Sequence, residues 1–108
     1  MVHIEIDMGV QEYTVTVTGH AGYAVKGKDI VCAGVSALFM GLCGAAEGQD
    51  IVTFENETEG AWRLRFYKTS EARDYIRFFR EGVRRVAEEY PDYCALYVNG
   101  EKYQTPVC

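Results

Sequence analysis

Apolar and polar residues alternate along two segments at the start of the chain. The apolar positions are Val2, Ile4 and Ile6 in the first segment and Tyr13, Val15 and Val17 in the second. Strict alternation is typical of strands that bury one face. A two-residue turn at Gly9-Val10 pairs Ile6 with Tyr13, and glycine as the first turn residue suits a type II′ hairpin. We therefore expect an antiparallel hairpin in this register.

A helical period replaces the alternation after residue 29. The apolar positions of this segment are Ile30, Val31, Val35, Leu38, Phe39, Leu42, Ala45 and Ala46. They cover more than half of the helix circumference, so we expect a largely buried helix, covered by its own sheet and by a partner chain. Asp29 is in position to cap its start, and Gly48 to end it.

The second half of the chain predicts two more strands and a second helix. Residues 51–56 and 61–67 form the strands, with Gly60 in their connection. Ser70 is expected to cap the helix, and Pro91 to end it. The apolar positions of the helix have the spacing i, i+3, i+4 and i+7, and they are Ala72, Tyr75, Ile76, Phe79, Val83, Val86, Ala87 and Tyr90.

A last strand and a tight turn complete the pattern. Cys94, Leu96 and Val98 alternate with other residues, and Asn99-Gly100 favours a hairpin directly after them. The predicted order is therefore ββαββαβ, with a short final strand. Because no repeat or linker interrupts the sequence, we expect a single domain over residues 1–108. Its fold class is α+β, a mainly antiparallel sheet packed by two helices.

Length and composition narrow the class of protein. The 108 residues are 48% hydrophobic and 25% charged, which allows a proper core and excludes intrinsic disorder. No apolar run approaches the roughly 18 residues that span a membrane, and the first residues lack the pattern of a secretory signal. We therefore expect a cytoplasmic protein without a membrane partner, whose four cysteines are free thiols. With no CxxC pair and two histidines, neither a metal site nor another cofactor is predicted.

Basic residues gather in one stretch of the second half. They are Arg63, Arg65, Lys68, Arg73, Arg77, Arg80, Arg84 and Arg85. Such a cluster suits nucleic acid binding. Acidic residues between them are typical of a solvated helix face instead, and this is the interpretation we favour. A non-catalytic ribosome- or RNA-binding module that uses the surface of residues 63–85 is the alternative.

The stretch GHAGYAVKGKDIVC (residues 19–32) combines a histidine, a glycine-rich loop and a cysteine. With Asp29 as N-cap, Cys32 occupies the third helical position, where free amides and the helix dipole favour an anion. His20 is then placed to take the thiol proton and return it to a leaving amine. Amides at the same helix start are expected to receive the carbonyl oxygen as it gains charge. A cysteine on an apolar helix is also commonly a packing residue, so spacing alone leaves both interpretations open.

The longer string GHAGYAVKGKDIVCAGVSALF (residues 19–39) closely resembles the signature of the ribosomal-processing cysteine protease Prp family. This resemblance implies a homodimeric, cofactor-free cysteine endopeptidase. Its substrate would be the precursor of large-subunit ribosomal protein number twenty-seven, from which it removes a short apolar N-terminal extension ending in aromatic residues. The resemblance also implies that His20 is the catalytic histidine, that Cys32 is the nucleophile, and that Asp29 and Ser36 support them.

The supporting residues each have a structural alternative. Asp29 is first a helix cap and second a group that orients His20. Ser36 lies one turn beyond Cys32, and it either bonds to its own helix or supports the site. His3 is expected to be solvated on the polar face of the first strand.

The loop between the two catalytic candidates is predicted to be mobile without substrate. Gly19, Gly22 and Gly27 allow many backbone conformations, and residues 21–28 contain no evident apolar anchor. Tyr23 either contacts the substrate or covers the site. Among the other cysteines, Cys43 and Cys94 are expected in the core, whereas Cys108 is expected to be an exposed terminal thiol.

Overall fold

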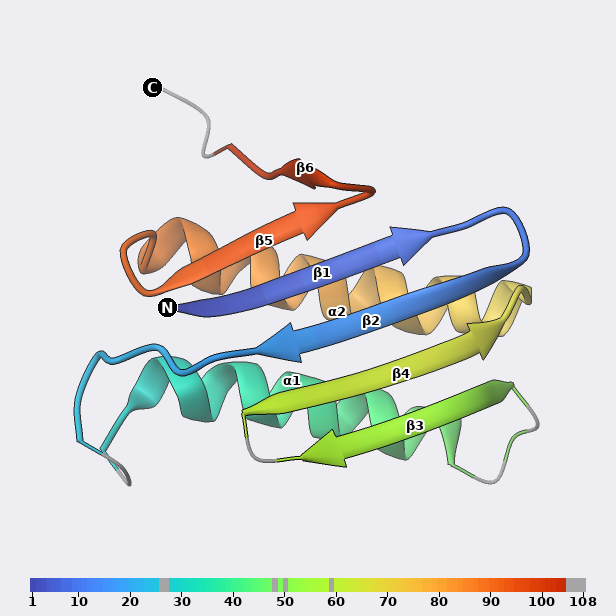
Figure 1. Ribbon diagram of the computed structural model, residues 1–108, viewed down its shortest axis with the longest axis horizontal. Helices are drawn as coiled ribbons and strands as arrows, with labels where there is room; N and C mark the ends of the chain where they lie inside the picture. Colours follow the sequence, from blue (N-terminus) through green and yellow to red (C-terminus); the bar gives the residue numbers. More distant parts are fainter. Residues whose placement is uncertain (26–27, 48, 50, 59, 105–108) are drawn as a thin grey trace.

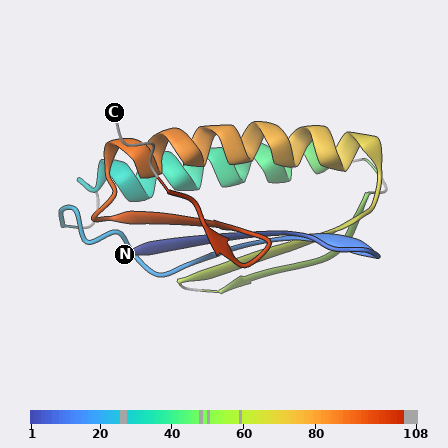
Figure 2. The same cartoon turned by 90° about the horizontal axis from the view of Figure 1, so that it is seen from above.

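The described residues form one six-stranded sheet with two helices side by side across one of its faces (Figures 1 and 2). The computed structural model describes residues 1–25, 28–47, 49, 51–58 and 60–104, with the backbone alone for 53–58. The strands are β1 (Val2–Met8), β2 (Glu12–Thr18), β3 (Val52–Thr58), β4 (Ala61–Tyr67), β5 (Cys94–Val98) and β6 (Glu101–Lys102). The helices are α1 (Ile30–Ala46) and α2 (Ser70–Glu89).

The sheet has the strand order β3-β4-β2-β1-β5-β6. Every neighbouring pair is antiparallel except β1 and β5, which run parallel. The predicted α+β class, the order of elements and the mainly antiparallel sheet are therefore confirmed. In the described part of the chain, no helix has the length and apolar character needed to cross a membrane.

The hairpin between β1 and β2 differs from the predicted register by two residues. Ile6 pairs with Val15 rather than with Tyr13, and Tyr13 pairs with Met8. Because β1 continues to Met8, Gly9 lies in a longer connection, and it does not have the positive φ that a type II′ turn needs. Side chains alternate with a period of two, so a shift by two leaves all apolar residues on the buried face.

The predicted boundaries of the helices need two corrections. Thr69 rather than Ser70 caps α2, because Thr69 has an extended backbone and its Oγ1 accepts the N–H of Ala72 at 3.0 Å. Ser70 is already the first helical residue. Helix α1 has Glu47 as its C-cap, and Gly48, the predicted stop, lies outside the described residues.

The core lies between the sheet and the helix pair. Its largest fully buried side chains include Phe66, Phe79, Ile4, Ile6, Leu64, Ile76 and Leu96. Phe39 of α1 connects the layers, because its ring lies 5.1 Å from that of Trp62 on β4 and 6.1 Å from that of Phe79 on α2. These contacts hold α1 beneath the first residues of β4.

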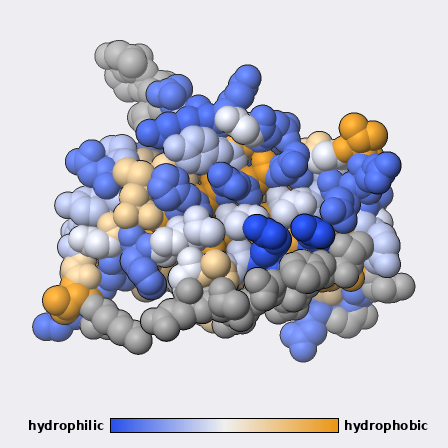
Figure 3. All heavy atoms as spheres, in the orientation of Figure 1, coloured by the Kyte–Doolittle hydropathy of each residue, from blue (hydrophilic) through white to orange (hydrophobic). Residues whose placement is uncertain are grey.

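The other face of the sheet is uncovered, and Figure 3 shows that it is mainly hydrophilic. Arg63 and Arg65 alternate with the buried Leu64 and Phe66, so both arginines lie on this open face. The remaining arginines of the cluster are on α2, which covers the opposite face. Arg84 among them is bound to glutamates of its own helix. The predicted basic stretch is therefore divided between two faces and does not form one continuous surface.

Candidate active site

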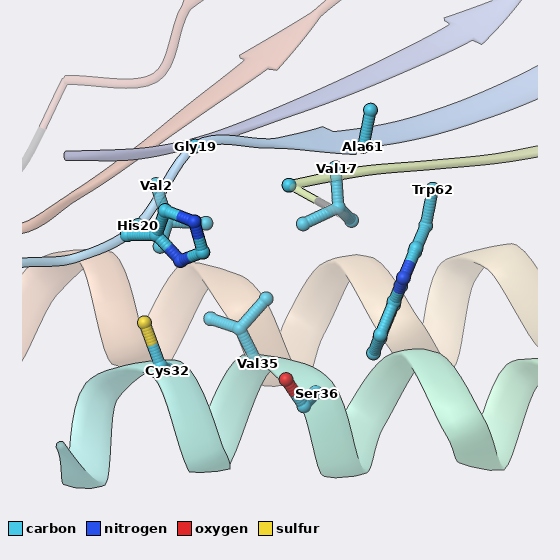
Figure 4. A pocket seen from close by; sticks show the side chains of 10 residues that line it. Val2, Val17, Gly19, His20, Cys32, Val35, Ser36, Ala61 and Trp62 are labelled. Atoms are coloured by element: carbon cyan, nitrogen blue, oxygen red, sulfur yellow. The ribbon is translucent and has the colours of Figure 1, made fainter. Parts of the chain in front are cut away.

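His20 and Cys32 lie on the same cavity, between the end of β2, the start of β4 and the first turns of α1. The cavity has a volume of about 120 Å³. Figure 4 shows the Cys32 sulfur pointing from α1 toward the His20 ring. The other lining residues are Val2, Val17, Gly19, Val35, Ser36, Gly60, Ala61 and Trp62. The structure thus brings together the two residues that the spacing suggested, although 12 positions separate them.

Asp29 places Cys32 in the third position of α1, as predicted. Its Oδ1 accepts the Cys32 N–H at 2.9 Å, so Asp29 is the N-cap. Its Oδ2 accepts the N–H of Tyr23 at 3.1 Å. These two bonds go to backbone amides, one of the helix and one of the loop. Asp29 therefore connects the loop to the helix.

The hydrogen bonds of Asp29 also set its protonation. Partial burial raises the pKa of the carboxyl, but hydrogen bonds from the amides of Cys32 and two loop residues lower it more. The net pKa of Asp29 lies below its ordinary value of 3.8. The cap is therefore ionised at neutral pH.

We expect Asp29→Ala to lower the free energy of unfolding by about 1 kcal/mol near neutral pH, because a helix cap is lost. The folded-state pKa is depressed, so the stability linked to ionisation is present above 3.8 and is lost as the pH falls through the folded pKa. Urea unfolding near neutral pH and below about pH 3 measures this difference, which should shrink in acid. Thr69→Ala removes a cap that does not titrate, and its deficit should be the same at both pH values. An Asp29→Ala deficit that is as large in acid as at neutral pH would contradict the assignment.

The amides at the start of α1 are not free to receive an oxyanion in the predicted way. The Cys32 N–H donates to Asp29 Oδ1, and the Ala33 N–H donates to the Asp29 carbonyl oxygen at 3.0 Å. The expectation that the amides around Cys32 hold the oxyanion is therefore wrong for these two groups. The loop supplies a donor to the sulfur rather than to an oxyanion: the N–H of the buried Ala21 points at Cys32 Sγ at 3.1 Å.

The turn before β4 lies against His20, a contact that local sequence patterns did not indicate. The Gly19 N–H donates to the Gly60 carbonyl oxygen at 2.9 Å. A Cβ atom on Gly60 would lie 3.6 Å from His20 Nε2, and Gly60 has a φ of +79°. Val2 and Trp62, which line the cavity, were also missed as site residues. Their positions depend on strand pairing, so no local signal could have identified them.

The loop glycines adopt conformations that suit glycine. Gly19 and Gly22 have φ values of +83° and +70°, in the left-handed region. Gly27 lies outside the described residues.

Ser36 lines the cavity one turn beyond Cys32, as its spacing predicted.

The loop has an apolar anchor, contrary to expectation. The ring of Tyr23 packs edge-on against Tyr90 at 5.4 Å and against Tyr93 at 5.1 Å. Ala21 is only 4% exposed. The absence of an anchor was inferred from residues 21–28 alone, whereas the anchor comes from the turn between α2 and β5.

The remaining candidates do not line the cavity. His3 is exposed on the open face of the sheet and stacks on Tyr97 at 5.9 Å. Cys94 is buried, as predicted, whereas Cys43 is half-buried against the core. Among the residues that the structure describes, no group of three or more His, Cys, Asp or Glu side chains could hold a metal ion.

We expect iodoacetamide at mildly acidic pH to modify Cys32 before the other described cysteines, because Cys32 is accessible and has the Ala21 amide on its sulfur. Cys94 is 2% exposed, and burial together with the negative charge of Cys32 raises its pKa to about 11. Peptide mass spectrometry over time measures the order of modification. Cys108 is the expected competitor and lies outside the described residues. Faster labelling of Cys43 or Cys94 would show that the site is misassigned.

Known cysteine proteases resemble this chain over most of its length. The sequence profile of the family described as Cysteine protease Prp matches residues 1–95. The Ribosomal processing cysteine protease Prp of Mycoplasma pneumoniae is 29% identical over 92 residues, which cover 84% of this chain and 92% of the relative. The protein of the same name from Mycoplasma genitalium is 27% identical over 100 residues, 92% of this chain and 99% of the relative.

The fold is also that of a solved protease. The crystal structure of the essential ribosomal processing protease Prp from S. aureus, in complex with a covalently linked product peptide, superposes with a TM-score of 0.80. The two chains are 25% identical, and the match covers 91% of this chain and 99% of that one. Together with the profile match over most of the sequence, these similarities show that the chain belongs to the cysteine protease Prp family.

Proposed function

We propose that this protease removes the N-terminal extension of the precursor of large-subunit ribosomal protein number twenty-seven, and that it does so in the cytoplasm. Cys32 is the nucleophile, and His20 is the general base and then the general acid. The observation that carries the proposal is the cavity in which the Cys32 sulfur faces His20 and receives the Ala21 amide. The names of the relatives support processing of a ribosomal protein.

The reaction uses the two side chains in sequence. His20 takes the thiol proton, and Cys32 Sγ attacks the carbonyl carbon of the scissile peptide bond. His20 then gives the proton to the leaving amine as the carbon–nitrogen bond breaks, which leaves a thioester on Cys32. Water, deprotonated by His20, hydrolyses the thioester and restores the thiol. The Ala21 N–H, 3.1 Å from Sγ, is a backbone donor beside the reacting atoms.

The walls of the cavity suit an apolar substrate residue. Val17, Val35 and Trp62 line the same cavity as Cys32, with Trp62 at the far end from the sulfur (Figure 4). The Trp62 ring packs against the ring of Phe39. An extension that is apolar and ends in aromatic residues would place such a side chain here.

Incubation of the purified protein with the unprocessed ribosomal protein, followed by mass measurement of the products, tests the proposal directly. One cut within the N-terminal extension is the expected result, and an intact precursor would contradict it.

We also propose that two copies of the chain associate through α1. This helix has no charged residue in its 17 positions. Met40 is 59% exposed on α1, and Phe78 is 76% exposed on the adjacent α2. The groove between α1 and α2 is lined by Phe78 and by small and apolar residues, among them Ala37 and Gly41. A two-fold pair of such faces buries apolar surface on both copies without leaving a charge unpaired.

We expect the wild-type protein to sediment as a dimer and Met40→Glu to sediment as a monomer at the same concentration, because the variant buries an unpaired carboxylate in the interface. Analytical ultracentrifugation measures both. Val10→Glu is the matched control, since Val10 is exposed in the loop between β1 and β2, away from α1. A dimeric Met40→Glu protein would place the interface elsewhere.

A further inference from the structure

Three tyrosines join the catalytic loop to a distant part of the chain. Tyr23 comes from the loop, and Tyr90 and Tyr93 come from the turn between α2 and β5. The two ring pairs are nearly perpendicular, with interplanar angles of 80° and 79° and centroid separations of 5.4 and 5.1 Å. Edge-to-face packing at these distances is attractive. We call these three side chains the aromatic clasp.

The turn that carries the clasp is itself firmly attached to the fold. The Tyr90 carbonyl oxygen accepts the N–H groups of Tyr93 at 3.0 Å and Cys94 at 3.1 Å. The Tyr93 carbonyl oxygen accepts the N–H of Val2 at 2.9 Å, and Val2 lines the catalytic cavity. Tyr23 therefore packs against a part of the molecule that has a defined position relative to the site.

The clasp is one of two points that hold the short segment above Cys32. At one end, the Gly19 N–H donates to the Gly60 carbonyl oxygen at 2.9 Å. At the other end, Tyr23 is held by its ring contacts and by the bond from its N–H to Asp29. His20 and Ala21 lie between these points. The Ala21 N–H then reaches Cys32 Sγ at 3.1 Å.

We propose that Tyr23, Tyr90 and Tyr93 are positioning residues for the nucleophile: the aromatic clasp holds the loop so that the Ala21 amide stays on the Cys32 sulfur and favours the thiolate. The clasp touches neither the sulfur nor the cavity, and it acts through the backbone of the loop. The inference rests on Cys32 being the nucleophile of the proposed function. It adds the requirement that the loop be held in place, which the pair of His20 and Cys32 alone does not include.

Alkylation of Cys32 at two pH values tests the proposal. In Tyr23→Leu, we expect the rate of Cys32 modification by iodoacetamide to fall about tenfold near pH 6.5, because one hydrogen bond to the charged form is lost. Near pH 9.5 the rate should change less than about twofold, because an ordinary cysteine thiol, with a pKa of about 8.5, is already mostly ionised at that pH. Tyr23→Phe keeps both ring contacts, and it should retain the wild-type rates. The titratable groups close to Cys32, namely His20, Asp29 and Cys94, are unchanged in these variants.

Three further variants make the outcome unambiguous. Tyr93→Leu removes the clasp from the β5 side and should reproduce the loss near pH 6.5, while the Tyr23→Leu/Tyr93→Leu double variant should be no slower than either single variant. Tyr97→Leu, on the open face of the sheet, is the matched control and should behave as wild type. Equal losses at both pH values, or a Tyr23→Phe protein as slow as Tyr23→Leu, would overturn the proposal. Labelling does not depend on the substrate, so a Cys32→Ser protein that still processes the precursor would refute the proposed function and leave this comparison intact.

Discussion

Cys32→Ala and His20→Ala should each abolish processing of the ribosomal precursor, with a loss of about three to four orders of magnitude in rate. Removing the thiol removes the atom that forms the thioester. Removing the imidazole leaves the leaving amine without a proton donor. Because the two side chains act as one unit, the double variant should be no slower than either single variant. Timed digestion of the precursor, followed by mass spectrometry, measures all three rates.

Two matched controls accompany this experiment. His3→Ala removes the other histidine of the chain, which is exposed on the open face of the sheet and stacked on Tyr97. This variant should process the precursor at the normal rate. Ser36→Ala changes a cavity residue that does not react, and it should lose much less activity than either dyad variant. An inactive His3→Ala protein together with an active His20→Ala protein would refute the dyad.

Gly19→Ala should destabilise the protein by about 3 kcal/mol and abolish activity, because two costs add at this position. Its φ of +83° strains any residue with a side chain, and a Cβ would lie 2.5 Å from the Met1 carbonyl oxygen. The loop could relieve this contact only by moving away from β1. The same movement would break the bond from the Gly19 N–H to Gly60 and displace His20. Urea unfolding measures the stability, and precursor digestion measures the activity.

Gly22→Ala carries the cost of backbone strain without the cost of a steric contact. Gly22 also has a positive φ, +70°, but a Cβ there would meet nothing within 4 Å. We expect this variant to lose about 1 kcal/mol of stability from the backbone strain alone and to remain folded. If Gly19→Ala were no less stable than Gly22→Ala, the contact with Met1 would not be what requires glycine at position 19.

The sequence by itself determined the features that depend on neighbouring residues. Alternation placed Ile4, Ile6 and Val15 on the buried face, and a register error of two residues in the first hairpin did not change this. The spacing from Asp29 to Cys32 put the cysteine at the third helical position, where the structure has it. Side-chain periodicity and helix capping act over four residues or fewer, so they can be recognised without knowledge of the rest of the fold.

Only the tertiary structure decided what surrounds the dyad. Gly60 and Trp62 reach the cavity because β4 pairs with β2, and Val2 reaches it because β1 lies between β2 and β5. Tyr90 and Tyr93 meet Tyr23 from about 70 positions away in the chain. Each of these pairings is stabilised by burial summed over a whole strand or helix, and no short segment contains that sum. The loop therefore looked unanchored in sequence, although Tyr23 packs against a distant turn and the Ala21 amide contacts Cys32.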